Sequence, residues 1–317
     1  MSKITKLAIL LLIFLITSSA LSAKGDSGSS GRYVIGVPTH SFADKWMTYL
    51  YDAIRAYDEE HDDVVFKLTD ANQDPKRQLN DVDNFIVDGV SALLLIPTDP
   101  DIVLPVGQKA KKAGIPLVLV NRLGTEEGMK LVNTYIGSRE EDAGIIQAEQ
   151  VAKLLDGKPG NIGILLGQIG HAAQIGRTKG VEDTIGAKYP NIKVIAKQTG
   201  NWDRAKGLAV TQDWFQAYPD INIILGNNDE MAIGAVLAAQ KAGKSDADLI
   251  IGGVDATPDA LEYLGKGLDF SVFQSAVGQG RGAAEAAHKW AKGEAAEKEV
   301  WIPFELVTME NASQYKN

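Results

Sequence analysis

Short clusters of charged, amide and aromatic side chains follow a series of apolar segments along this 317-residue chain. One of them is "GNWDR" (200–204), where a tryptophan stands between an asparagine and a charged pair. A carboxylate only accepts hydrogen bonds, a guanidinium only donates them and an amide does both, so this mixture suits hydroxyl groups. An indole can cover the apolar face of a sugar ring and remove it from water. The clusters therefore indicate binding of a polyhydroxylated ligand.

The candidate binding residues come from both halves of the chain. Those in the first half are His40, Asp44 and Trp46, which follow one apolar segment, and Asn121 and Arg122, which follow another. Those in the second half are His171, Arg177, Trp202, Asn228, Asp255 and Gln274. Because each half supplies a tryptophan, we expect the two indoles to hold a ring between them.

Each candidate also has an explanation that needs no ligand. Trp46 shares a helical face with Leu50 and Ile54 and would suit a core. Asn228 and Asp255 end apolar segments, where turn geometry alone accounts for them. Arg122 and Arg177 could form ion pairs within the protein, and His171 could occupy a solvated loop position. Asp203 and Asp229 are well placed as helix N-caps.

The elements that must position these residues alternate regularly. Apolar, β-branched segments predict ten strands, at 33–38, 64–70, 91–97, 116–121, 133–138, 161–167, 192–197, 221–226, 248–255 and 269–275. Amphipathic helical patterns stand between them, and this alternation predicts parallel sheets covered on both faces. Ten strands are many for one twisted sheet, so we expect two lobes. Ligands of such sheets bind beyond the carboxyl ends of the strands.

The composition excludes several classes of partner and chemistry. A formal net charge of −9 argues against binding nucleic acid, because a phosphate backbone needs a basic surface. Cysteine is absent, which excludes disulfides, thiolate metal sites and a cysteine nucleophile. The 45% hydrophobic and 23% charged residues are typical of a soluble globular protein.

The N-terminus has the layout of a cleavable secretory signal. Two lysines precede an uninterrupted apolar run over residues 7–16, and small residues follow. We expect a signal peptide over 1–23, with cleavage after Ala20 or Ala23, and a flexible leader over 24–32. An uncleaved membrane anchor is the alternative, although the apolar run is short for a span. The mature protein is thus expected to be soluble and periplasmic.

No motif in the chain supports an enzyme. The segment "GQGRGAAEA" (278–286) matches a dinucleotide-binding pattern, but that pattern belongs at the first strand–helix turn of its domain, whereas here it stands near the end of the chain. A G-x-S-x-G nucleophile elbow is absent, and the four histidines lack metal-ligand spacing. Paired carboxylates on facing loops leave a glycosidase as the rival interpretation. We therefore expect neither catalysis nor a cofactor.

Three segments, "GNNDEMAIGAVLAAQKAGK", "GGVDATPDAL" and "NWDRAKG", closely resemble those of the ribose- and galactose-binding proteins. These are periplasmic receptors of sugar ABC transporters, and the resemblance runs in order from about Tyr33 to the end. It implies the type I periplasmic binding fold, an α/β fold of two similar doubly wound parallel-sheet lobes joined by a three-segment hinge. The lobes would comprise 33–137 plus 276–304 and 138–275 plus 305–317, with crossings near 137–138, 275–276 and 303–305.

The resemblance also places the eleven candidates on ligand or hinge positions. Asn121–Arg122 matches an Asp–Arg pair of the ribose-binding branch, whereas His171 and Trp202 match residues of the galactose-binding branch. Two positions depart from the family, since Ile96 replaces a ligand-binding asparagine and Ala173 replaces an aspartate. We therefore expect a hybrid pocket for a pyranose, a cyclitol or a linear polyol. The segment "LLDGKPGNIG" lacks the calcium-loop pattern of the galactose branch, so no calcium is expected.

As a function, the resemblance implies a monomeric solute receptor that closes on its ligand and docks on the membrane permease of an ABC importer. A receptor for chemotaxis or signalling is the alternative, since both roles would use the same closed form. A sugar-responsive repressor shares the fold but needs an N-terminal helix-turn-helix, and the signal-like start stands in its place.

Overall fold

The computed structural model describes residues 31–244 and 249–315. The predicted signal peptide, 1–23, and most of the leader, 24–32, lie outside the described residues. Within the described part of the chain, no helix combines the length and the apolar character needed to cross a membrane. The strands of these residues form a six-stranded, a four-stranded and a two-stranded sheet.

The six-stranded sheet is parallel throughout, in the order β11–β5–β4–β3–β1–β2. Its strands are β1 (Tyr33–Thr39), β2 (Val64–Asp70), β3 (Ala92–Leu95), β4 (Leu117–Val120), β5 (Thr134–Gly137) and β11 (Glu299–Trp301). Every residue of β3, β4 and β5 is buried, as expected for strands that are covered on both faces.

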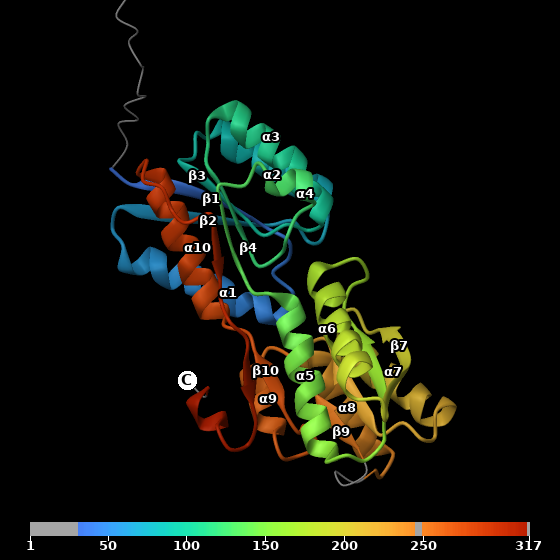
Figure 1. Ribbon diagram of the computed structural model, residues 1–317. Helices are drawn as coiled ribbons and strands as arrows, with labels where there is room; N and C mark the ends of the chain where they lie inside the picture. Colours follow the sequence, from blue (N-terminus) through green and yellow to red (C-terminus); the bar gives the residue numbers. More distant parts are fainter. Residues whose placement is uncertain (1–30, 245–248, 316–317) are drawn as a thin grey trace, which may run out of the picture. The chain divides into compact units, whose positions relative to one another are not determined.

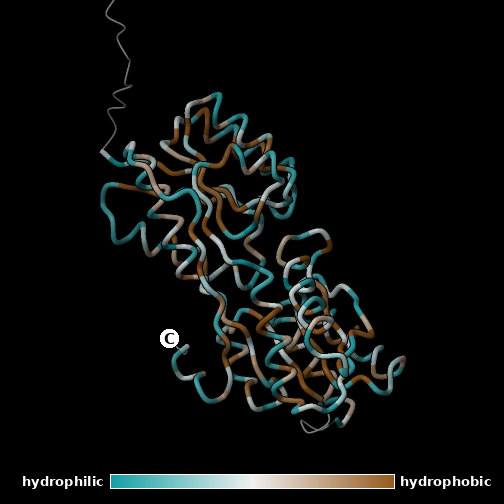
Figure 2. The backbone as a smooth tube through the Cα atoms, in the orientation of Figure 1, coloured by the Kyte–Doolittle hydropathy of each residue, from teal (hydrophilic) through white to brown (hydrophobic). Residues whose placement is uncertain are grey.

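Helices cover both faces of this sheet (Figure 1). On one face, α1 (Lys45–Glu60) and α10 (Ala276–Ala291) pack apolar side chains such as Leu50, Ile54 and Ala283 against the strands. The other face carries α2 (Pro75–Val87), the 3-10 turn η1 (Pro100–Ile102), α3 (Val103–Ala113) and α4 (Glu126–Met129). Figure 2 shows the apolar residues concentrated along the strands and the polar ones on the outer turns.

The four-stranded sheet is also parallel and doubly wound. It contains β7 (Ile192–Thr199), β6 (Gly160–Leu166), β8 (Ile223–Gly226) and β9 (Ile250–Gly252), in that order. One face carries α5 (Glu140–Leu155) and α6 (Ala172–Lys188), and the other α7 (Arg204–Ala217), α8 (Asp229–Lys241) and α9 (Pro258–Tyr263). Beyond β9 lie the antiparallel strands β10 (Ser271–Phe273) and β12 (Glu305–Val307), followed by η2 (Ala312–Gln314).

This architecture confirms the predicted α/β fold with two doubly wound parallel sheets. All ten predicted strands form, with ends that differ from the prediction by up to three residues. The sequence did not predict β11 and β12, because each has only two apolar residues after a glutamate and Pro303 interrupts the apolar stretch between them. The chain leaves the six-stranded sheet after β5, returns to it after β10, and leaves it again after β11.

Candidate ligand-binding site

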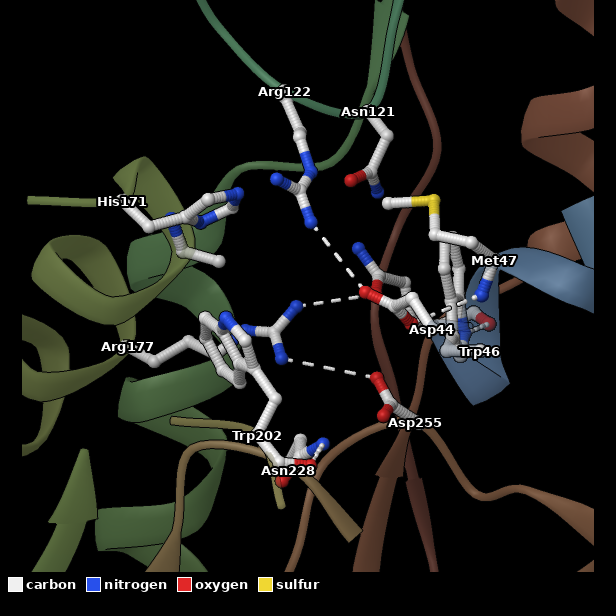
Figure 3. Close-up of a pocket in the computed structure, with 12 residues that line it drawn as sticks. Asp44, Trp46, Met47, Asn121, Arg122, His171, Arg177, Trp202, Asn228 and Asp255 are labelled. Atoms are coloured by element: carbon white, nitrogen blue, oxygen red, sulfur yellow. Dashed lines mark hydrogen bonds and ion pairs between the residues drawn. The ribbon is translucent and has the colours of Figure 1, made fainter. Parts of the chain in front are cut away.

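A cavity lies among the loops that follow the strands of both parallel sheets (Figure 3). The space between protein atoms there, including the part open to solvent, is about 360 Å³. Its lining consists of Asp44, Trp46, Met47, Asn121, Arg122, His171, Ala173, Arg177, Trp202, Asn228, Asp255 and Gln274. The site therefore has the position that the topology of open parallel sheets predicts.

Ten of the eleven predicted residues line this cavity. The eleventh, His40, lines a larger adjoining cavity that shares Asp44, Arg122 and Trp202 with the first. The sequence missed Met47, which follows Trp46 on α1 and has the burial pattern of a core residue. Ala173 lines the cavity where the galactose branch has an aspartate, whereas the fully buried Ile96 lines neither cavity.

Asp44 and Arg122 form a charged wall on the side of the six-stranded sheet. Asp44 caps α1, accepting the Met47 N–H at 3.3 Å, and its Oδ2 lies 3.4 Å from a guanidinium nitrogen of Arg122. Burial alone would raise the pKa of Asp44, but the charge of Arg122 and the hydrogen bond from the Met47 N–H oppose burial, and the pKa of Asp44 lies below its usual value. Asp44 is therefore an ionised acceptor at neutral pH.

Asn121 stands beside this pair in a left-handed backbone conformation with φ 65°. Asparagine tolerates this region better than most residues do. Its side-chain nitrogen donates to Gln279 on α10 at 2.9 Å, and Gln279 in turn donates to Ser138 at 3.0 Å. The amide nitrogen of Asn121 is thus engaged by the protein, while its oxygen remains for the cavity.

Arg177 is the buried cation on the side of the four-stranded sheet. It pairs with Glu140 at 2.8 Å, and donates to the Asn227 carbonyl at 2.6 Å. It also donates to the Gln274 side chain at 3.1 Å, and the carboxylate of Asp255 lies 3.8 Å away. Burial raises the pKa of Asp255, and the charge of Arg177 opposes this rise.

Trp202 follows β7 in an unusual backbone conformation. Trp202 and Asn201 have φ values of 66° and 51°, and such conformations cost non-glycine residues about 1–3 kcal/mol each. Asn228 helps to hold them, because its Nδ2 donates to the Trp202 carbonyl at 3.3 Å. The indole lies against Gly167, where any side chain would overlap the ring.

Four buried nitrogens of the cavity have no hydrogen-bond partner within the described part of the chain: Arg122 Nε, His171 Nε2, Trp202 Nε1 and Gln274 Nε2. His171 Nδ1 accepts the Ala173 N–H at 3.1 Å, and burial lowers the pKa of His171, so the neutral ring carries its proton on Nε2. All four nitrogens are therefore donors. Because leaving a buried donor unpaired costs about 1–3 kcal/mol, such a cluster indicates a place for acceptor oxygens.

Some of the candidate residues also have the structural roles that the sequence analysis offered as explanations without a ligand. Trp46 packs into the core of the first sheet, and its Nε1 donates to the Gln274 carbonyl at 3.3 Å. His171 is buried and caps α6, so the prediction of a solvated loop position was wrong. Asp203 caps α7 as predicted, whereas α8 is capped by Asn228. The prediction of Asp229 as that cap was also wrong, because its side chain turns to a neighbouring loop.

Among residues 31–244 and 249–315, no group of three or more histidine or acidic side chains is arranged to hold a metal ion. The arrangement is one of hydrogen-bond donors, carboxylates and indoles around one cavity. Such a site can bind a hydroxylated molecule by its oxygens and by its apolar faces.

Two doubly wound parallel sheets with this cavity at their carboxyl ends define a solute-binding protein of the type I periplasmic fold. The chain belongs to the periplasmic binding protein domain family, which it matches over residues 35–295. The resemblance inferred from three short segments is thereby confirmed. The family consists of extracytoplasmic solute-binding proteins, so the chain is not an enzyme.

The chain is 39% identical to a putative rhizopine-binding protein of Rhizobium meliloti, over 89% of this chain and 92% of that protein. It is 30% identical to the ribose import binding protein RbsB of Bacillus subtilis, over 97% of this chain and 99% of that one. A solved structure from Bacillus halodurans C-125, an ABC transporter solute-binding protein with bound myo-inositol, has a TM-score of 0.85 and 38% identity. That match covers 92% of this chain and 99% of the other.

Proposed function

We propose that the protein binds a neutral polyhydroxylated ring, a cyclitol first and a monosaccharide second, and delivers it to an ABC importer. The observation that carries this proposal is the cluster of four unpaired buried donors that line one cavity with the carboxylates of Asp44 and Asp255. Hydroxyl groups suit both the donors and the carboxylates, since a hydroxyl group can accept a hydrogen bond from a donor and donate one to a carboxylate.

The charges of the cavity favour a neutral ligand. Arg122 is paired with Asp44, and Arg177 with Glu140, so neither guanidinium is left to balance an anionic ligand. Hydrogen bonds to charged partners are the stronger ones, which gives a neutral polyol enough affinity. Trp46 and Trp202 approach from opposite sides in Figure 3 and would cover the faces of a ring.

The relatives favour a cyclitol within this class. The Bacillus halodurans protein, whose structure matches nearly the whole chain, holds myo-inositol. The ribose-binding relative is less similar to this chain, at 30% identity.

Ligand binding would couple to closure of two lobes, 33–137 plus 276–304 and 138–275 plus 305–317. Arg177 supports this coupling because it contacts a residue at or beside each proposed crossing: Glu140 by an ion pair, Gln274 by a hydrogen bond and the Phe304 ring at 5.7 Å. A ligand shifts closure only by its preference for the closed form. Polar groups from both lobes around one ligand provide that preference.

In this proposal the protein is exported through a signal peptide, acts as a monomer in the periplasm and releases its ligand to the permease. A role in chemotaxis through a chemoreceptor is the less favoured alternative. Uptake of labelled myo-inositol by cells with and without the protein separates the two roles. Transport predicts loss of uptake without the protein, whereas unchanged uptake with a lost swimming response would overturn it.

The ligand class is tested by a thermal-shift screen of residues 24–317, unfolded and refolded to remove any co-purified ligand. The panel contains myo-inositol, scyllo-inositol, D-ribose, D-galactose and xylitol. A ligand at 100 times its Kd adds about 2.7 kcal/mol to the free energy of unfolding. We expect the largest shift with myo-inositol. A larger shift with a monosaccharide would replace the cyclitol assignment, and silence across the panel would overturn the proposed function.

A further inference from the structure

Asp229 lies beneath the proposed ligand site, and the function described so far gives it no task. It is fully buried at the first position of α8. Its neighbour Asn228 caps that helix, so the carboxylate of Asp229 is not needed there. A buried carboxylate is costly unless hydrogen bonds compensate it, and its partners therefore show what it holds in place.

Those partners are Thr257, in the loop that follows β9, and Ser271, the first residue of β10. One carboxylate oxygen accepts the Thr257 N–H at 2.9 Å. The other accepts the hydroxyl of Ser271 at 2.6 Å, and the oxygen of Ser271 accepts the Ala256 N–H at 3.0 Å. Two successive N–H groups of the loop are thus fixed by Asp229, one directly and one through a single hydroxyl.

The same loop has a strained backbone at the residue that faces the ligand cavity. Asp255 has a φ of 122° and Ala256 a φ of 49°. Positive φ values at non-glycine residues persist only where the surroundings hold them. The Thr257 N–H ends on Asp229 directly, and the Ala256 N–H ends on Ser271, whose hydroxyl donates to Asp229. Gly253 leaves room for the carboxylate of Asp229, because a side chain at Gly253 would collide with it.

We propose that Asp229 is a positioning residue for ligand recognition, which holds the loop 255–257 so that the carboxylate of Asp255 faces the ligand. This inference rests on the proposed function, in which Asp255 accepts hydrogen bonds from ligand hydroxyls. Asp229 touches no part of the cavity itself. Its effect on the ligand passes through the backbone of the loop.

The charged groups that face Asp255 are Arg177 on α6, Asp229 on α8, Asp44 before α1 and Glu140 on α5. Burial raises the pKa of Asp255, Arg177 lowers it, and the three carboxylates raise it further. Burial also raises the pKa of Asp229, to about 7, so Asp229 loses its charge as the pH falls below neutral. Its hold on Asp255 therefore rests on the hydrogen bonds to the loop and not on its charge.

The test compares Asp229→Asn with the wild type by calorimetric titration with myo-inositol and by amide hydrogen exchange. We expect Kd to rise at least fivefold at pH 7.5, and exchange at Ala256 and Thr257 to accelerate at least tenfold. Asp74→Asn is the matched control, since Asp74 also binds two backbone N–H groups at a helix start but lines neither cavity.

Ser271→Ala removes the hydroxyl that links Asp229 to Ala256, leaves the Thr257 N–H on Asp229, and serves if Asp229→Asn fails to fold. It should accelerate exchange at Ala256 more than at Thr257. Unchanged exchange in the folded variant, or a Kd within twofold of the wild type while Asp255→Asn loses tenfold, would overturn the positioning role. If Asp255→Asn and Asp229→Asn both leave Kd unchanged, the proposed site itself is wrong. The exchange measurement needs no ligand, so the two failures are distinguishable.

Discussion

Arg122 donates a hydrogen bond to Nε2 of His40 over 2.9 Å. The acceptor nitrogen carries no proton, so the neutral ring holds its proton on Nδ1, which lies 3.2 Å from the Tyr51 hydroxyl. That hydroxyl donates to the Ser41 carbonyl at 3.0 Å. The result is a buried chain of hydrogen bonds from Arg122 to the backbone. His40 therefore supports the cavity through Arg122.

This chain of bonds predicts an acid-sensitive stability. Burial, together with the charge of Arg122, lowers the pKa of His40 from 6.5 to about 4. In the unfolded chain His40 takes up a proton below pH 6.5, whereas in the folded protein it does so only near pH 4. The free energy of unfolding therefore decreases as the pH falls from 6.5 to 4. By pH 4.5 the loss from this one residue is about 2.5 kcal/mol.

The measurement is denaturant unfolding at pH 7.5 and pH 4.5 for the wild type and His40→Gln. Glutamine keeps an acceptor for Arg122 but does not titrate. The variant should lose about 2.5 kcal/mol less than the wild type between the two pH values. Equal losses would show that His40 does not titrate in this way.

Gly167→Ala should displace the indole of Trp202, because a Cβ at this position overlaps the ring. We expect an affinity loss of tenfold or more, which is about 1.4 kcal/mol, since the face of the ligand loses its cover. Gly186→Ala is the control, because nothing lies within 4 Å of the new Cβ. Calorimetric titration decides, and equal affinities of the two variants would contradict the prediction.

Trp202→Ala should weaken binding at least tenfold, while Trp202→Phe should retain part of the affinity. Asn228→Ala should have a similar effect on binding and also destabilise the fold by about 1 kcal/mol, because Asn228 caps α8. Asn228→Ser keeps a capping oxygen but loses the donor to the Trp202 carbonyl, and separates the two effects. Losses below threefold for both alanine variants would mean that the pocket is misplaced.

Arg177→Met should destabilise the fold by about 3–5 kcal/mol, because it leaves the buried Glu140 without its partner. Burial raises the pKa of Glu140 and Arg177 opposes the rise, so the orphaned carboxyl would take up a proton more readily. Adding Glu140→Gln should restore at least about 1 kcal/mol. Denaturant unfolding of the single and double variants measures this, and strictly additive losses would refute the coupling.

Much of the fold was predictable because burial leaves a periodic trace in the sequence. Strands such as β3 and β4 are buried on both faces and read as continuous apolar runs. The three-residue strands β11 and β12 leave no such trace, because each has only two apolar residues after a glutamate. Their existence follows from tertiary contacts alone.

The candidate site was predictable to the extent that parallel topology gathers strand ends. That rule, together with the family resemblance, placed ten cavity residues in advance. Sequence reasoning chose wrongly between the adjacent residues Asn228 and Asp229 as the cap of α8, since both suit a helix start. The tertiary structure determines which residue caps α8: Asn228 accepts the Met231 N–H, whereas the side chain of Asp229 accepts the Thr257 N–H in the loop after β9.

The sequence by itself determined the alternation of elements, the class of ligand chemistry and the residue types at each strand end. Only the tertiary structure decided which polar atoms are already satisfied by the protein. Arg122 and Gln274 each form hydrogen bonds with other side chains, yet one buried donor of each, Arg122 Nε and Gln274 Nε2, is left unpaired. Hydrogen bonds depend on ångström distances between segments far apart in the chain, and periodicity, which reports only local burial, carries no record of them.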